Sequence, residues 1–316
     1  MSDVGRTGPA LGFGCAGLQL TESRRANERL LGAAWDAGVT WFDVARSYSY
    51  GTAEGILGSF LRYRRSDAVI VTKFGISPPH ALMRNRGVRA AAAIALRLAP
   101  QSRARGLAAA NARVVRGDFS LLAAKRSLHT SLKQLRTDYV DALLLHEADV
   151  DDTHRADLCA WLQECVDRGT ILRWGIATHD IDKTAEIVRD TRTHVTTIQI
   201  PDSLLRPAVQ RFPDLLHSEL LISHSMIKND VPLISQWLTA DSKRLHEWSD
   251  QIGMNLQDTG ALVQLVLANA LARPYAGAVV YSSRDERHCA QAAKARMVSE
   301  DSLSAFTHMI TLISAS

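Results

Sequence analysis

Short apolar runs that end in a polar residue recur along this chain. Three of them cover residues 41–43, 69–73 and 142–146, and they end in Asp43, Lys73 and His146. Parallel strands that are covered on both faces are nearly continuous hydrophobic runs, so each run is predicted to be a buried parallel strand. Helices are predicted between the runs, so strands and helices alternate along the chain.

This alternation predicts an α/β protein built as a (β/α)8 TIM barrel, with residues 1–316 forming a single domain. A first strand is predicted just before residues 15–18. The later strands are predicted at 172–177, 196–200, 220–223 and 277–281. Helices are predicted at 22–37, 54–61, 119–135, 155–168, 183–189, 208–217, 258–272 and 284–294, with an extra C-terminal helix at 301–313.

The polar residues that end these strands carry the candidate chemistry. In an (α/β) barrel, the C-terminal ends of the strands build the active site. Asp43, Lys73 and His146 end consecutive predicted strands, and Tyr48 lies on the loop after the first of them. One pocket would therefore hold an acid, an ammonium, an imidazole and a phenol.

These four groups suit proton transfer to a carbonyl oxygen. An ammonium beside the phenol is expected to lower the pKa of Tyr48, and Asp43 would hold Lys73 in place and keep it charged. Tyr48 would donate the proton, and an N–H of His146 would orient the carbonyl and stabilise its developing charge. No metal-ligand cluster is evident in the sequence, so a bound hydride carrier is the inferred electron source.

At this point the sequence resembles the aldo-keto reductases. The stretch 38–45, followed by Tyr48, Gly51, Glu54 and 57–58, resembles the first signature of the family. Thr72-Lys73 resembles its lysine strand and 135–146 its histidine strand. The resemblance runs in order from about residue 11 to about residue 284. It implies a catalytic set of Asp43, Tyr48 as acid/base, Lys73 and His146, which are the roles that the strand ends suggest independently.

The resemblance also implies a nicotinamide cofactor, NADP(H) in preference to NAD(H), although several positions depart from the family pattern. The pair that follows strand five is Ala177-Thr178, of which only Thr178 can hydrogen-bond through its side chain, and Gln199 is retained on strand six. His224 stands where an aromatic ring is usual, beside Ser225, the expected pyrophosphate contact. Ser282, Ser283 and Arg284 resemble the loop that holds the ribose phosphate. Gln291-Ala292 replaces the usual adenine-contacting Asn.

The stretch from about 76 to 117, after the third strand, is the least family-like segment. It contains eight arginines and no acidic residue up to position 117: Arg84, Arg86, Arg89, Arg97, Arg103, Arg105, Arg113 and Arg116. One hypothesis is a lid on the catalytic face that receives an anionic substrate. The alternative is that these arginines pair with the acidic loop Glu147, Asp149, Asp151 and Asp152, or simply solvate the segment.

Composition narrows the class of protein further. The 46% of hydrophobic residues can form a large core, and the formal net charge of +4 is too small to argue for nucleic acid binding. The sequence shows no signal peptide and no membrane-spanning run, and its four cysteines lack CxxC spacing, so a cytoplasmic protein is expected. The predicted activity is reduction of an aldehyde or ketone to an alcohol, or the reverse. The alternatives are a cofactor-binding regulatory barrel with little turnover and a non-redox lyase or isomerase. Oligomeric state is not predicted.

Overall fold

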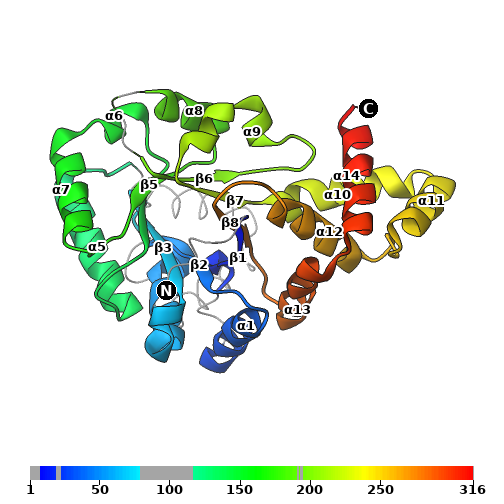
Figure 1. Ribbon diagram of the computed structural model, residues 1–316. Coiled ribbons are helices and arrows are strands. Elements are labelled where there is room, and N and C mark those ends of the chain that lie inside the picture. The colour runs from blue at the N-terminus through cyan, green and yellow to red at the C-terminus, as the bar shows by residue number, and fades with distance from the viewer. Residues whose placement is uncertain (1–7, 19–22, 79–116, 191, 193–194, 316) are drawn as a thin grey trace, which may run out of the picture. The chain divides into compact units, whose positions relative to one another are not determined.

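A computed structural model describes residues 8–18, 23–78, 117–190, 192 and 195–315 of the chain. Within these residues, eight strands follow one another in chain order in a closed barrel, and helices separate them (Figure 1). This architecture confirms the predicted (β/α)8 TIM barrel. The strands are β1 Ala10–Gly14, β2 Trp41–Asp43, β3 Val69–Phe74, β4 Ala142–His146, β5 Trp174–Ala177, β6 Thr197–Pro201, β7 Leu220–His224 and β8 Gly277–Tyr281.

The helices of the described residues agree with the predicted ones to within a few residues at most positions. They are α1 Arg24–Asp36, α2 Ala53–Phe60, α5 Leu121–Leu135, α6 Val150–Thr153, α7 Ala156–Asp167, α8 Ile181–Arg189, α9 Ala208–Arg211, α10 Met226–Thr239, α11 Ser242–Ile252, α12 Thr259–Leu271, α13 Glu286–Lys294 and α14 Glu300–Ala315. Short 3-10 turns, among them η1 Cys15–Gly17, η2 Tyr48–Gly51 and η6 Pro213–His217, complete the connections.

The chain divides into two compact units. One comprises residues 14–31 and 42–177, and the other comprises residues 1–13, 32–41 and 178–316. In the first unit, β3, β4 and β5 pair in parallel, with Lys73 opposite Leu144. Helices α2 and α5 pack against each other, and α5 also packs against α7. A Cβ on Gly58 would lie 2.4 Å from the carbonyl oxygen of Gln134, so only glycine permits this close approach of α2 to α5.

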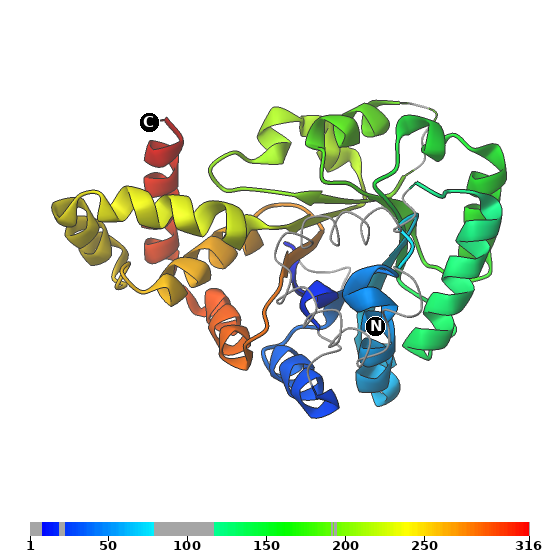
Figure 2. The same ribbon diagram turned by 180° about the vertical axis from the view of Figure 1, so that it is seen from behind.

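In the second unit, β6, β7 and β8 pair in parallel, and β8 also pairs with β1. Helix α12 packs against α10, α13 and α14, and this helical cluster is visible from both sides in Figures 1 and 2. Gly277 opens β8 at a φ of +136°, and a Cβ there would lie 2.0 Å from the carbonyl oxygen of Leu221. The first contact between β7 and β8 therefore requires glycine.

The helices of the structure differ from the predicted ones at several places. The helix predicted over 208–217 is divided into α9 and η6, because Phe212 has a φ of −133° and ψ of 82° and Pro213 begins the second turn. Helices α10 and α11 were not predicted. A helical pattern was present for α10, because Met226, Asp230, Ile234 and Leu238 recur every four residues and are buried. Pro232 interrupts that pattern.

The arginine-rich stretch is the one predicted feature that the structure does not address. All eight of its arginines lie outside the described residues. In the described part of the chain, no helix is long and apolar enough to cross a membrane. All four cysteines are free thiols, three of them buried.

Candidate active site

Asp43 and Lys73 form a buried ion pair at the C-terminal ends of β2 and β3, which are consecutive strands along the chain. Asp43 is the last residue of β2 and Lys73 the fifth of β3, and the ammonium of Lys73 donates to Oδ1 of Asp43. Their side chains are 5% and 2% exposed, respectively. Isolated buried charges are strongly disfavoured, so the burial of Lys73 depends on its pairing with Asp43.

Tyr48 and His146 lie beside this pair. The Nζ of Lys73 is 3.4 Å from the Tyr48 hydroxyl oxygen and donates a second hydrogen bond, of 3.2 Å, to the Val44 carbonyl oxygen. The rings of Tyr48 and His146 meet edge to face, with centroids 6.3 Å apart and an interplanar angle of 82°. The structure therefore brings together all four residues that the sequence proposed as catalytic, within one compact unit of the chain.

The pKa of Tyr48 differs from the sequence-based expectation. Burial raises this pKa most strongly, the nearby Lys73 ammonium lowers it, and the Asp43 carboxylate raises it again, so the net shift is upward. The expected lowering by Lys73 is present, but the cost of removing a phenolate from water outweighs it. Tyr48 is thus held as a neutral phenol at neutral pH, which is the form that can donate a proton.

Lys73 shows the opposite balance. Burial lowers the pKa of its ammonium, but the attraction of Asp43 and the contacts with Tyr48 exceed this effect, and the net shift is upward. Lys73 is therefore a permanent cation across the physiological pH range. Its charge stabilises any negative charge that develops on the Tyr48 oxygen.

The turn after Tyr48 has an unusual backbone. Ser49 and Tyr50 have φ values of 50° and 59°, and Gly51 follows at 83°, so three residues in a row are left-handed. Side chains secure this turn: the Ser49 hydroxyl donates to the Leu18 carbonyl oxygen, and the Thr52 hydroxyl donates to the Ser49 carbonyl oxygen at 2.7 Å. Backbone strain of this kind persists only where the surroundings impose it, and it is concentrated at functional sites.

Another left-handed residue, Glu147, follows His146. Glu147 has a φ of 64°, and its N–H donates to the Ala177 carbonyl oxygen at 2.8 Å. The chain then enters α6, where the Asp149 N–H donates to the Asp152 carboxylate at 2.9 Å. Part of the acidic loop is thus engaged at the start of its own helix.

A polar chain that was not predicted from the sequence lies next to the four residues. Arg46 donates to Glu54 at 2.5 Å, and the other carboxylate oxygen of Glu54 accepts from the Thr72 hydroxyl at 2.8 Å. Arg46, Glu54 and Thr72 are all buried. The available signal was an Arg and a Glu eight positions apart on either side of Tyr48, with no other charged residue between them.

The residues proposed for cofactor binding all lie in the second unit. Gln199 is 3% exposed, and its Oε1 is buried without a hydrogen-bond partner among the described residues. Thr178, next to it in the sheet, donates its N–H to the Gln199 carbonyl oxygen at 3.1 Å. The Thr178 hydroxyl contacts the Thr184 hydroxyl and the Asp180 carbonyl oxygen, so it is engaged at the start of α8.

His224 ends β7, and Ser225 begins the turn into α10. The Nδ1 of His224 lies 2.7 Å from the Ser225 hydroxyl, and Ser225 is left-handed with a φ of 71°. The ring of His179 meets the ring of His224 with centroids 5.5 Å apart. His179, which the sequence analysis did not single out, therefore lies beside a proposed cofactor residue.

The loop after β8 carries Ser282, Ser283 and Arg284. Ser282 and Arg284 are exposed, whereas the buried Ser283 hydroxyl contacts the Asp285 carbonyl oxygen and Nδ1 of His288. Asp285 caps α13 and also holds Arg287 at 2.6 Å, and these contacts lower the pKa of the Asp285 carboxyl to about 2. Arg287, in the first turn of α13, is thus paired with a carboxylate.

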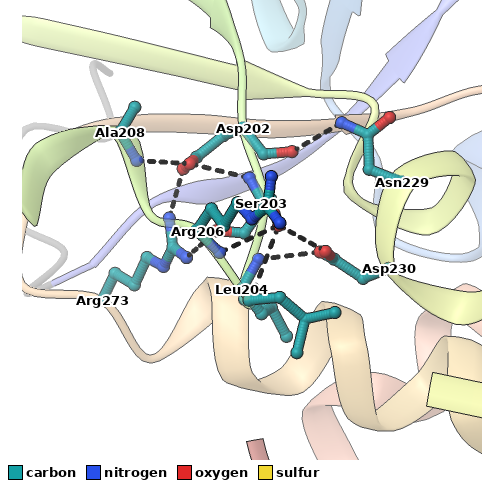
Figure 3. A network of polar contacts seen from close by, with 9 residues as sticks. Asp202, Ser203, Leu204, Arg206, Ala208, Asn229, Asp230 and Arg273 are labelled. Carbon is teal, nitrogen blue, oxygen red and sulfur yellow. Dashed lines mark hydrogen bonds and ion pairs between the residues drawn. The ribbon is translucent and has the colours of Figure 1, made fainter. Parts of the chain in front are cut away.

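The segment after Gln199 is fixed by a buried polar network (Figure 3). Asp202 pairs with Arg273 and also accepts from the N–H groups of Ser203 and Ala208 at 2.8 and 3.0 Å. Asp230 accepts from the Ser203 hydroxyl at 2.5 Å and from the Leu204 N–H at 2.7 Å. Burial raises the pKa of Asp230, although these hydrogen bonds oppose the shift.

Comparison with known proteins decides the family. A family profile described as "Aldo/keto reductase family" matches residues 10–251, which is most of the chain. The chain belongs to the aldo/keto reductase family. Membership confirms the family that the sequence motifs indicated.

Curated relatives match parts of this family member. It is 46% identical over 78 residues to pyridoxal 4-dehydrogenase of Microbacterium luteolum, covering 23% of each protein. It is 29% identical over 194 residues to D-threo-aldose 1-dehydrogenase of a Pseudomonas species, covering 58% of this chain and 54% of that protein. The chain therefore spans between about a quarter and about half of the length of these relatives.

The fold likeness extends over nearly the whole chain. An aldo/keto reductase from Klebsiella pneumoniae, solved in complex with NADP and acetate, superimposes with a TM-score of 0.61 at 20% identity. The match covers 96% of this chain and 91% of that one. At this level of identity the likeness supports the barrel fold. Among the described residues of this chain, no group of three or more His, Cys, Asp or Glu side chains is arranged to hold a metal ion.

Proposed function

We propose that this aldo/keto reductase family member interconverts a carbonyl compound and an alcohol, using NADP(H) as hydride carrier and Tyr48 as acid/base. The observation that supports this most strongly is the placement of the Tyr48 hydroxyl 3.4 Å from the Lys73 ammonium, itself paired with buried Asp43. A phenol that is kept protonated beside a fixed cation is suited to donating a proton while the cation stabilises the resulting charge.

Each of the four residues has a distinct part in this proposal. Tyr48 donates its proton to the carbonyl oxygen during reduction and recovers one in the reverse direction. Lys73 stabilises negative charge on the Tyr48 oxygen, and Asp43 keeps Lys73 charged and in place. His146, whose ring lies against Tyr48, orients the carbonyl oxygen through an N–H donor.

The residues present fit a nicotinamide. Gln199 carries a buried oxygen with no donor among the described residues, and a carboxamide N–H would satisfy it. His224 and Ser225 would lie along the nicotinamide and pyrophosphate, and Thr178 would contribute after its hydroxyl leaves Thr184. Ser282, Ser283 and Arg284 would hold the ribose phosphate, since Arg suits a dianion. When bound, the cofactor supplies the hydride.

The substrate class proposed here is a small aldehyde, ketone or corresponding alcohol. The relatives named for pyridoxal and for D-threo-aldoses make these compounds sensible members of a test panel. We also propose that the arginines of the stretch 76–117 favour an anionic substrate. A matched pair of an anionic and a neutral aldehyde tests this, because replacing Arg84, Arg86 and Arg89 with uncharged residues would then raise KM for the anionic one alone.

Absorbance of the reduced nicotinamide, followed with this panel in both directions and with both NADP(H) and NAD(H), tests the activity. Turnover that requires Tyr48 supports the proposal. Tight NADP(H) binding without turnover on any member would instead support a regulatory barrel. Conversion of a substrate without any change in the cofactor would support the lyase or isomerase alternative.

A further inference from the structure

A buried chain of three polar side chains joins both ends of the Tyr48 loop to strand β3. Arg46 lies two residues before Tyr48, and Glu54 lies six residues after it, in the first turn of α2. The guanidinium and the carboxylate meet at 2.5 Å with side-chain exposures of 8% and 1%, so the segment 46–54 is a loop closed by a buried ion pair.

The same carboxylate anchors this closed loop to the lysine strand. The second oxygen of Glu54 accepts the Thr72 hydroxyl at 2.8 Å, and Thr72 directly precedes Lys73. Neighbouring side chains on a strand point to opposite faces, so Lys73 contacts Tyr48 on one side of β3 while Thr72 contacts Glu54 on the other. The distance between the Tyr48 and Lys73 side chains thus depends on a contact made behind the strand.

The backbone of this loop makes such an anchor necessary. Ser49, Tyr50 and Gly51 are all left-handed, a conformation that costs free energy for the non-glycine residues Ser49 and Tyr50. Without a constraint at both ends, the turn would relax toward ordinary backbone angles. Relaxation would move the Tyr48 hydroxyl away from Lys73.

We propose that Arg46, Glu54 and Thr72 are positioning residues that hold the Tyr48 hydroxyl against Lys73 and inside its buried environment. They touch neither substrate nor cofactor in this proposal, which rests on Tyr48 being the acid/base of the proposed function. They act by fixing the loop that carries Tyr48. They therefore determine both the proton affinity of the Tyr48 phenol and the position of its hydroxyl.

The test uses variants that separate positioning from stability. Arg46→Met leaves the Glu54 carboxylate buried and unpaired, so it is expected to destabilise the protein as well as loosen the loop. The triple variant Arg46→Met/Glu54→Leu/Thr72→Val replaces the whole chain with apolar groups of similar volume. Replacing a buried ion pair in this way is often neutral or stabilising, so the triple variant is expected to recover the stability but not the anchor.

A half-buried ion pair of the same unit provides a control. Arg65 meets Asp141 at 2.8 Å with side-chain exposures of 14% and 16%, and Asp141 also accepts the Ile70 N–H near the start of β3. The control variant Arg65→Met/Asp141→Asn removes this pair, whose Asp141 contacts β3 through the Ile70 N–H. It leaves the Tyr48 loop untouched.

Two readouts are measured. In steady-state kinetics, misplacing a reacting group by about 1 Å can cost about 100-fold, so the triple variant is expected to lose about 10- to 100-fold in kcat, with KM and NADPH affinity nearly unchanged. The second readout is the ultraviolet difference signal of tyrosinate. Subtracting the spectrum of the same variant carrying Tyr48→Phe isolates the Tyr48 phenol, at pH values near the ordinary tyrosine pKa of about 10 where circular dichroism shows folded protein.

Burial is the largest contribution that raises the pKa of Tyr48. The triple variant should therefore show more Tyr48 phenolate than the parent at the same pH, and the Arg65→Met/Asp141→Asn control should match the parent in both readouts. Parental kcat and parental Tyr48 titration in a folded triple variant would overturn the proposal, leaving Arg46 and Glu54 a merely structural pair. Because the titration needs no substrate, it decides the positioning role even if the chain turns over no carbonyl compound.

Discussion

The ammonium of Lys73 lies 3.4 Å from the Tyr48 hydroxyl oxygen, yet the pKa of Tyr48 is raised. Burial of the phenol therefore dominates over the attraction of a neighbouring cation. The pair is suited to proton donation by Tyr48, followed by stabilisation of the phenolate by Lys73.

Replacing Tyr48 with phenylalanine removes the acid/base group and little else. We expect Tyr48→Phe to keep the fold and the cofactor affinity and to lose about 10²- to 10⁴-fold in turnover, the usual effect of losing a general acid. Steady-state rates with an aldehyde, together with fluorescence titration of NADPH, measure the two quantities. A parental rate in this variant would remove Tyr48 from the mechanism.

The stability that the Asp43–Lys73 pair provides should depend on pH with a defined sign. The folded-state pKa of Lys73 is raised above its usual value of about 10.4. Its contribution is therefore complete below that value and is lost as pH rises through the folded-state pKa. Lys73→Met leaves Asp43 buried and unpaired, which should cost about 3 to 5 kcal/mol near neutral pH.

Urea unfolding of the parent and of Lys73→Met, at about pH 8 and about pH 11, measures this difference. The gap in unfolding free energy should narrow at the higher pH, because Lys73 is then largely deprotonated in the unfolded parent and must take up a proton on folding. A gap that stayed constant would show that Lys73 is not the group responsible.

Gln199 offers a prediction with opposite effects on stability and on binding. Its buried Oε1 has no partner in the described part of the chain. Gln199→Leu should therefore leave the cofactor-free protein as stable as the parent or more so, while NADPH binding weakens by about 0.5 to 1.5 kcal/mol. Thermal unfolding and fluorescence titration measure these effects.

Gln134 on α5 is a matched control, because its Oε1 is also buried without a partner among the described residues. Gln134→Leu should have a similar effect on stability and none on NADPH. If the two variants bound NADPH equally well, Gln199 would have no place in the cofactor site.

Arg284 should discriminate between the two nicotinamide cofactors. Losing a charge-assisted contact costs about 1.5 to 3 kcal/mol, so Arg284→Ala is expected to weaken NADPH binding and leave NADH binding nearly unchanged. Arg287→Ala is the control, because Asp285 already holds the Arg287 guanidinium at 2.6 Å. Equal losses for NADPH and NADH would argue against a contact with the 2′-phosphate.

The buried network after β6 should contribute more to the free energy of unfolding than an ion pair on the surface does. Asp202 is fully buried in its side chain and pairs with Arg273, which is 12% exposed. Arg273→Met should cost about 3 kcal/mol or more, because the carboxylate remains buried without its cation. Arg211→Met breaks an exposed pair with Asp182, with side-chain exposures of 64% and 63%, and should cost less than about 1 kcal/mol. Urea unfolding of both variants provides the comparison.

Hydrophobic periodicity was sufficient to predict where the strands end, and so which residues are candidates for catalysis. Asp43, Lys73 and His146 follow mainly apolar runs, and parallel strands require these ends to meet on one face of the barrel. The sign of the pKa shift of Tyr48 could not be predicted in this way. It depends on how completely the folded protein removes the phenol from water, and no local pattern encodes that.

Contacts between distant side chains were likewise beyond the sequence. The edge contact between His179 and His224 and the engagement of the Thr178 hydroxyl by Thr184 follow from packing of separate elements. The pairing of Arg46 with Glu54 depends on the left-handed turn between them. The sequence does not predict this turn, because serine and tyrosine, which occupy positions 49 and 50, seldom adopt a positive φ.

The left-handed turn at 49–51 also bears on attempts to improve this protein by selection. Glycine at position 49 would remove the steric cost of a φ of 50°, so a screen for heat resistance would favour it. The same change would delete the hydroxyl that ties the turn to Leu18 and would widen the range of conformations open to Tyr48. Selection for thermal stability and selection for turnover would therefore favour different residues at position 49.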